Sequence, residues 1–187
     1  MQQIDTELFL FLNGDGGYYL DNIMNWLSSR WAATPIYAGL LYLLFQKYKK
    51  GIIKIIPAVA LLILVSDQVS VAVKNIVERE RPCHNISLAR QVHQVEHRCG
   101  GKFGFYSSHA SNTMALAIFC GLLLAYKPII WGLILWSIAV GYSRIYLGVH
   151  YPADICVGWI AGGLLGWTTA RLLLPFLKAN QQTNENA

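Results

Sequence analysis

The sequence predicts an all-α integral-membrane protein, a helical bundle of about five transmembrane helices preceded by amphipathic helices at the membrane surface. Hydrophobic residues make up 55% of the 187-residue chain and charged residues only 13%. The mean hydropathy is +0.39, an unusual value for a water-soluble globule. The apolar residues form long blocks with Lys and Arg at their ends, unlike the short alternating runs of soluble folds. The surplus apolar surface is therefore expected to face lipid.

Residues 1–30 are predicted to form interfacial helices. Ile4, Leu8 and their neighbours recur at helical spacing before the Gly-rich break at 13–17, which indicates a short amphipathic helix. A second apolar stripe containing Ile23 faces polar residues, as in a helix that lies in the membrane plane. The first residues are acidic where a signal peptide is basic, so no cleavable targeting segment is expected.

Residues 31–178 are predicted to be the transmembrane core, which together with the interfacial helices forms one domain, residues 1–178. The five spans are expected at residues 31–46, 52–75, 109–126, 128–144 and 152–174. Pro128 and Pro152 fall just inside helix starts, where the missing N–H is not needed. A polar loop at 76–106 joins the second and third spans on the extracytoplasmic side, and the polar tail at 179–187 is expected to be disordered.

Glycine recurs every four residues in the last predicted span, at Gly158, Gly162 and Gly166. Such small residues let two membrane helices approach closely. Packing within one chain is favoured over a dimer seam, and the oligomeric state stays open.

Counting spans brings six ionisable residues to one membrane face: Lys74, Arg81, His109, Arg144, His150 and Asp154. Ionisable groups near span ends are unfavourable without a function, and three clustered cations repel unless an anion joins them. A phosphoryl group fits, because Lys and Arg donors match its charged oxygens. The start of the third span, from Ser107 to His109, adds backbone N–H groups.

Two histidines at different helix starts can divide the roles of nucleophile and acid. His150 precedes Asp154 by four residues, so the carboxylate can hold one imidazole nitrogen and leave the other to attack phosphorus. His109 would then protonate the leaving oxygen. The alternative reading of the His150 and Asp154 pair is a structural helix cap.

Three ordered motifs carry a family resemblance. Residues 74–82 have the form KxxxxxxRP, and residues 143–154 have the form SRxxxxxHxxxD. The chain resembles the type 2 phosphatidic-acid phosphatase superfamily. Its middle motif, PSGH, corresponds to residues 106–109, where Ser107 and His109 match while Tyr106 and Ser108 depart from the pattern.

The resemblance implies a metal-free reaction without cofactors through a phosphohistidine. His150 is the implied nucleophile, Asp154 its orienting group and His109 the general acid. The implied phosphate ligands are Lys74, Arg81, Ser107 and Arg144. Ser108, which departs from the family motif, is added as a candidate ligand because it adjoins Ser107. The expected function is a membrane lipid phosphatase acting on a lipid phosphate or pyrophosphate: phosphatidic acid, phosphatidylglycerol phosphate, polyprenyl pyrophosphate or lipid A phosphate.

Two other function classes remain as alternatives. A non-enzymatic lipid or anion transporter would also place charges within the membrane, although the chain has no internal repeat. A soluble vanadate-dependent haloperoxidase would need a similar oxyanion pocket, but the apolar composition disfavours it. Nucleic acid is not an expected partner, because the basic residues form no stripe.

Membrane orientation follows from the lysines between the first two spans. Lys47, Lys49, Lys50 and Lys54 crowd a short loop, where the positive-inside rule is most reliable. The loop is therefore expected in the cytoplasm, and the site on the periplasmic face of a bacterial inner membrane.

Cys83 and Cys99 bracket the polar loop and can pair in an oxidising compartment. A zinc site with the loop histidines His84, His93 and His97 is the less favoured alternative. Asp67, inside the second span, is interpreted as a structural hydrogen-bonding residue.

Overall fold

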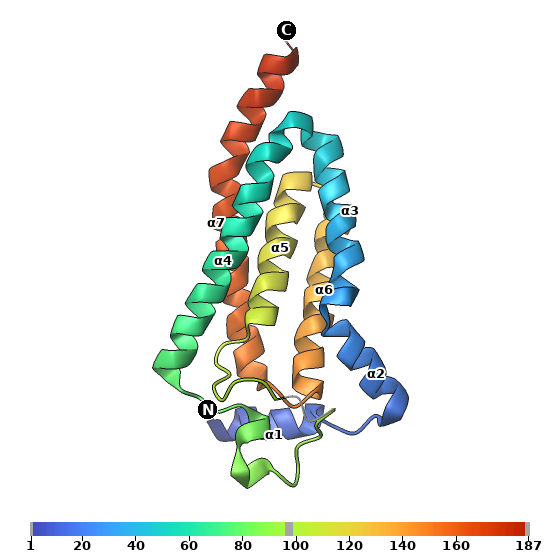
Figure 1. Cartoon of the computed structure of the whole chain (residues 1–187), viewed down its shortest axis with the longest axis vertical. Helices are drawn as coiled ribbons and strands as arrows, with labels where there is room; N and C mark the ends of the chain where they lie inside the picture. The colour runs from blue at the N-terminus through green and yellow to red at the C-terminus, as the bar shows by residue number, and fades with distance from the viewer. Residues whose placement is uncertain (1, 96–98, 186–187) are drawn as a thin grey trace.

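The computed structural model describes residues 2–95 and 99–185, and over these residues the chain is all-α. The helices are α1 (Gln2–Leu12), α2 (Gly17–Leu27), α3 (Arg30–Tyr48), α4 (Ile52–Val77), α5 (Ser108–Leu124), α6 (Lys127–Tyr146) and α7 (Pro152–Glu185), with the 3-10 turns η1 (Lys49–Gly51), η2 (Pro82–His84) and η3 (Ile86–Leu88). Helices α3 to α7 run along the long axis, and α1 lies across one end (Figure 1). The all-α prediction is confirmed.

The five long helices α3 to α7 fall where the five spans are expected. The difference is at the end of the chain, where α7 continues to Glu185. The backbone is thus helical over most of the segment 179–187 that was expected to be a disordered tail, and residues 186–187 lie outside the described part. Lys, Ala and Gln are good helix formers and extend an existing helix easily.

Helix α5 is the centre of the bundle. Its buried residues include Ala115, Phe119 and Leu123, which belong to the main apolar core. Long helices surround it, with α4 and α7 on one side in Figure 1 and α3 and α6 on the other. Ser107 caps the N-terminus of α5, and its Oγ accepts a hydrogen bond from the Ala110 N–H. The start of this central helix is therefore fixed where the site forms.

The glycine stripe of α7 packs against the backbone of α5. A Cβ atom built at Gly162 would lie 2.0 Å from the Ser111 carbonyl oxygen, and one at Gly166 would lie 2.3 Å from that of Ala115. The stripe therefore serves packing within one chain, as the sequence interpretation favoured.

We expect Gly162→Ala to lower the thermal unfolding temperature of the detergent-solubilised protein. The added methyl group must push α7 away from α5, and such overpacking destabilises by roughly 1–3 kcal/mol. Gly39→Ala in α3 is the matched control, because a Cβ there meets nothing within 4 Å. Equal melting temperatures for the two variants would contradict the close approach of the helices.

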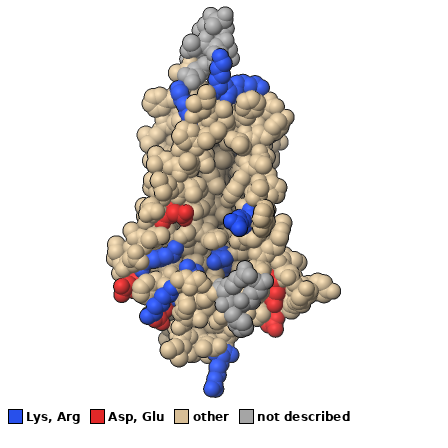
Figure 2. Space-filling model, in the orientation of Figure 1, with Lys and Arg blue, Asp and Glu red and all other residues tan. Residues whose placement is uncertain are grey.

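The outer surface of the bundle is suited to lipid. The segments Arg30–Val77, which contains the α3–α4 hairpin, Lys127–Tyr146 and Pro152–Ala179 are long and apolar enough to cross a membrane, and α5 is a shorter apolar helix. Large apolar side chains such as Ile53, Trp131 and Leu172 are exposed on these helices. Figure 2 shows a broad uncharged band between two ends where charges gather. The chain is therefore an integral-membrane protein.

Helix α1 packs against the bundle with one face and leaves the opposite face exposed. Phe9 is fully buried against the Tyr151 ring, with centroids 5.4 Å apart. Ile4 and Phe11 are exposed, and with them one face of the helix stays apolar and uncovered. Such an apolar face suits a helix at a membrane surface, and the interfacial location of residues 1–30 stays a prediction.

Candidate functional site

The structure gathers the predicted site residues at the end of the bundle that carries α1 (Figure 1). They come from four helices and two connections: Lys74 in the last turn of α4, Arg81 in the loop after it, Ser107, Ser108 and His109 at the start of α5, Arg144 in the last turn of α6, His150 between α6 and α7, and Asp154 in the first turn of α7. Each lies at the end of a helix or just outside it, where water at the end of the apolar bundle can still reach a charged group.

His150 and Asp154 form a buried pair, with 2% and 0% of their surfaces exposed. His150 Nδ1 lies 3.3 Å from Asp154 Oδ2, which also accepts the Tyr151 N–H. Arg81 Nη1 lies 3.2 Å from His150 Nε2. A guanidinium can only donate, so Nε2 is the acceptor and the ring proton sits on Nδ1, facing the carboxylate. The lone pair of Nε2 thus points toward the cations.

Burial of the ring lowers the pKa of His150 well below its usual range, and the positive charge of Arg81 is the second largest cause. Loss of solvation and nearby positive charges both disfavour the protonated form of an imidazole. The ring is therefore neutral at physiological pH, which is the form that can act as a nucleophile.

A lowered pKa means that the neutral ring persists as the pH falls. We therefore expect the acid limb of kcat/KM, which reports the free enzyme, to lie below about pH 6.5, the ordinary value for histidine. Arg81→Gln removes a cation that lowers the pKa, so its acid limb should move to higher pH. An acid limb at or above pH 6.5 in the unmodified enzyme would contradict this.

Three cations lie beside the pair. Lys74 Nζ donates to Ser70 Oγ at 2.9 Å and to Ser108 Oγ at 2.6 Å. It thus turns toward α5 instead of pairing along its own helix with Glu78. Ser108, at the position where the family motif has Gly, supplies one of these hydroxyl groups.

The two arginines keep unused donors. Arg81 Nη1 donates to the Val149 carbonyl, and Arg144 Nη1 donates to Ser28 Oγ. The Nε atoms of both are buried and have no hydrogen-bond partner among the described residues. Lys74, Arg81 and Arg144 lie within electrostatic range of one another. Clustered cations with unsatisfied N–H groups are suited to bind an anion with several oxygens.

His109 is exposed to a cavity of about 750 Å³ between α3, α4, α5 and α6. Ser28, which accepts from Arg144, also lines this cavity, and its inner walls are apolar, with Leu44, Ile55 and Leu116. A volume of this size suits a small ligand or part of a larger one. The Ser107 N–H, expected to face an anion, instead donates to the Asp154 carbonyl at 3.0 Å.

The site includes two residues that sequence reasoning missed. Arg79 joins two carboxylates: its Nη1 lies 2.9 Å from Asp154 Oδ1, and its Nη2 lies 2.6 Å from Asp5 Oδ2. The Arg79 guanidinium also stacks 4.0 Å from the Tyr151 ring centroid. Asp5 Oδ1 accepts the Ala153 N–H across 148 positions of sequence. Helix α1 is therefore tied to the carboxylate that orients His150.

We expect Arg79→Gln to reduce kcat roughly 10–100-fold with little change in KM, the range found when a residue that orients a metal ligand is removed. Gln cannot bridge Asp5 and Asp154, so the Asp154 carboxylate loses its fixed orientation toward His150. Arg79→Lys should restore part of the rate, and Arg90→Gln in the exposed part of the loop is the control. A purely structural role would change the melting temperature of Arg79→Gln and leave the kcat of the folded fraction unchanged.

Two further expectations concern residues around the site. Asp67 Oδ1 accepts a hydrogen bond from Asn112 Nδ2 at 2.8 Å, in agreement with the structural role inferred for it. Cys83 and Cys99 form a disulfide with Cα atoms 5.9 Å apart, so their sulfurs are not available to a metal. His84 contacts the Gly100 carbonyl and His93 pairs with Asp21, while His97 lies outside the described residues.

Comparison with known proteins identifies the family of the chain. The sequence pattern of the PAP2 superfamily matches residues 36–177, which contain all three motifs. The lipid A 4'-phosphatase of Bacteroides thetaiotaomicron is 36% identical over 170 residues, 89% of this chain and 76% of that protein. The protein of the same description from Porphyromonas gingivalis is 35% identical over 88% of this chain and 70% of its own length.

Solved structures share the fold. The crystal structure of Aquifex aeolicus LpxE has a TM-score of 0.66 and 24% identity, and covers 89% of this chain and 94% of that one. The transmembrane PAP2-type phosphatidylglycerolphosphate phosphatase of Bacillus subtilis has a TM-score of 0.68 at 19% identity, over 95% and 86%. Family match, relatives and fold all confirm the resemblance carried by the three motifs: the chain belongs to the PAP2 superfamily and is an integral-membrane lipid phosphatase.

Proposed function

We propose that this enzyme removes a phosphate monoester from lipid A, through a phosphohistidine on His150, on the periplasmic face of a bacterial inner membrane. The observation that carries the chemistry is the buried His150, held between Asp154 and Arg81, with His109 of the same site lining a largely apolar cavity. The lipid A assignment is supported by the two lipid A 4'-phosphatases that share 35–36% identity over nearly nine tenths of the chain.

The first half-reaction transfers the phosphoryl group to the enzyme. Lys74, Arg81 and Arg144 bind the phosphate oxygens, and Arg81 exchanges its contact with His150 Nε2 for one with the phosphate. Nε2 attacks phosphorus while the bond to the sugar oxygen breaks. The negative charge of the bound phosphate offsets the cations and favours the protonated form of His109, which gives that oxygen a proton. Asp154 stabilises the positive imidazole ring through Nδ1.

The second half-reaction returns the enzyme to its starting state. His109, now neutral, takes a proton from water as the water oxygen attacks phosphorus. The bond from phosphorus to Nε2 breaks, and inorganic phosphate leaves. In this scheme side chains stabilise the negative charge of the phosphate in both the ground state and the transition state. The proposal therefore needs no metal at the reacting atoms.

The cavity accounts for the lipid part of the substrate. His109 and Ser108 line part of it, and most of the remaining lining is apolar and comes from α3 to α6, although Asp67 and Asn112 also line it. A phosphate at the cations and an acyl chain in the cavity would place the bond to be broken at His109.

The membrane side is supported by charge and by the disulfide. Four lysines, Lys47, Lys49, Lys50 and Lys54, surround η1 at the opposite end of the bundle, and short lysine-rich loops stay in the cytoplasm. The Cys83–Cys99 disulfide is in the loop at the site end, and disulfides persist in oxidising compartments such as the periplasm. This orientation needs all five long helices to cross the membrane.

A substrate panel tests the proposal. Purified enzyme with a chelator is given lipid A bisphosphate, phosphatidic acid, phosphatidylglycerol phosphate and undecaprenyl pyrophosphate, and released phosphate is measured. We expect the largest kcat/KM for lipid A, and mass spectrometry of the product should locate the lost phosphate. His150→Ala is the blank for contaminating phosphatases. A preference for undecaprenyl pyrophosphate would overturn the lipid A assignment while leaving the phosphatase class intact.

A further inference from the structure

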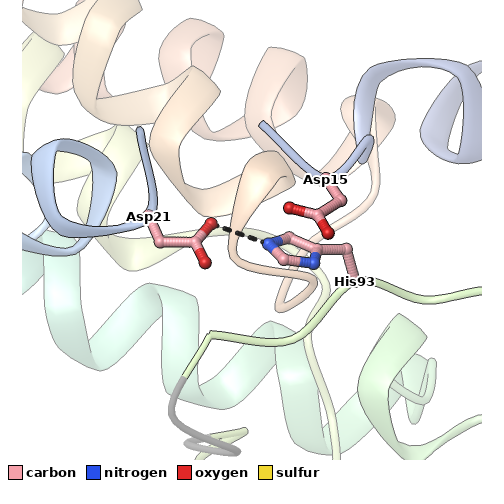
Figure 3. Close-up of side chains that lie close together, drawn as sticks. All are labelled: Asp15, Asp21 and His93. Carbon is pink, nitrogen blue, oxygen red and sulfur yellow. Dashed lines mark hydrogen bonds and ion pairs between the residues drawn. The ribbon is translucent and has the colours of Figure 1, made fainter. Parts of the chain in front are cut away.

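Three metal-ligating side chains that the phosphatase site does not use meet beside the loop 78–107. Asp15 comes from the α1–α2 turn, Asp21 from α2 and His93 from the loop, and they point toward one another (Figure 3). One ligand atom of each lies within 4.8 Å of the other two. His93 Nε2 and Asp21 Oδ1 are 2.8 Å apart.

The backbone of His93 is held from both sides by one buried side chain. Asn13, 4% exposed, accepts the His93 N–H at 2.7 Å and donates to the His93 carbonyl at 3.0 Å. The same Asn13 amide donates to the carbonyls of Ile145 and Tyr146. His93 is thus positioned against the end of α6 even though it lies in a long loop.

The two carboxylates are oriented as well. Tyr146 Oη donates to Asp21 Oδ1 at 2.6 Å, and Asp15 Oδ1 accepts the Gly17 N–H at 2.8 Å. Hydrogen bonds of this kind to ligating groups are typical of metal sites, where outer partners fix the ligands.

We propose that Asp15, Asp21 and His93 bind one divalent transition-metal ion, with Zn²⁺ as the best fit. One imidazole and two carboxylates are a ligand set that Zn²⁺ accepts, with bonds of about 2.0–2.2 Å and water in a fourth position. Binding requires His93 and Asp21 to separate slightly, because two ligands of one ion lie farther apart than a hydrogen-bonded pair.

The ion would be structural, since it joins segments without contacting the reacting atoms. It would link the α1–α2 turn and α2 to the loop that carries Arg79 and Arg81. Tyr146, two residues after Arg144, donates a hydrogen bond to the ligand Asp21 at this place. Its binding would therefore stabilise the loop over the site while the metal-free phosphatase chemistry proceeds separately.

Asp15 distinguishes a metal site from a simple ion pair. Its side chain is exposed and accepts from its own turn at Gly17, whereas the ion pair joins Asp21 and His93. Asp15→Asn can keep the hydrogen bond to Gly17 and the shape of the side chain, and it removes one negative ligand. The matched control is Glu7→Gln, an exposed acidic residue of α1 away from the cluster.

The test measures Zn²⁺ binding to the full-length, detergent-solubilised protein. The protein is first treated with a chelator, the chelator is removed, and binding is then followed by calorimetry and by thermal unfolding. We expect one Zn²⁺ per chain and a rise in Tm, with Kd increased at least tenfold in Asp15→Asn and in His93→Gln. Glu7→Gln and His150→Ala should bind as the unmodified protein does, the latter excluding binding at the catalytic histidine. Absence of saturable binding, or equal Kd in Asp15→Asn and Glu7→Gln, would overturn the proposal.

Discussion

His150→Gln is expected to lower kcat for phosphate release by about 10⁴-fold or more, the scale seen when a nucleophile is removed from a covalent mechanism. The structure gives the reason: His150 Nε2 carries the lone pair on the side of the cations, and Nδ1 is engaged by Asp154 at 3.3 Å. Glutamine can still donate to Asp154 from its amide, but an amide nitrogen is not a nucleophile. The fold and the phosphate ligands should survive.

The intermediate itself can be trapped to separate this mechanism from others. Acid-sensitive label from a ³²P-labelled substrate should appear on the unmodified protein within one turnover and be absent from His150→Gln. Melting temperature and chromatographic profile serve as controls for folding. If His150→Gln turned over at a rate near that of the unmodified enzyme, or carried the label, the assignment of the nucleophile would be wrong.

Arg144→Lys is expected to lower kcat about 10²–10³-fold, the usual loss when one donor to developing charge is removed. Arg144 is held at the end of α6 with one nitrogen on Ser28 and a buried Nε that makes no hydrogen bond within the described residues. Lysine keeps the charge but offers no planar pair of donors for two phosphate oxygens. The effect therefore tests geometry and not charge alone.

Steady-state kinetics on the preferred lipid, with kcat and KM determined separately, would measure this effect. Arg171→Lys in α7, whose guanidinium lies 5.9 Å from the Trp167 ring, makes the same substitution outside the site and should leave kcat unchanged. If Arg144→Lys retained full kcat, Arg144 would serve only as a basic residue at a helix end.

The clustering of the candidate site residues could largely be predicted because each lies in a motif of short spacing or at a span end, while their roles stay predictions. His150 and Asp154 are four residues apart, and Lys74 and Arg81 seven, so local helix geometry and the alternation of spans bring them to one face. Arg79 lay unnoticed inside the first motif. The available signal was that Arg79 lies two residues before Arg81, directly after α4. The bridging role of Arg79 depends on Asp5, which only the fold brings close to it.

The helical class, the long apolar helices and the end of the bundle that holds the charges were predictable from local sequence patterns. These features follow from interactions within one segment and from the need of apolar blocks for lipid. Four features depend on the folded chain: the approach of Gly162 to α5, the cavity beside His109, the Arg79 bridge, and the cluster of Asp15, Asp21 and His93. Contacts between distant segments depend on how helices rotate against one another and how a long loop folds back. A pattern of neighbouring residues does not encode those rotations, which are selected by packing of the whole chain.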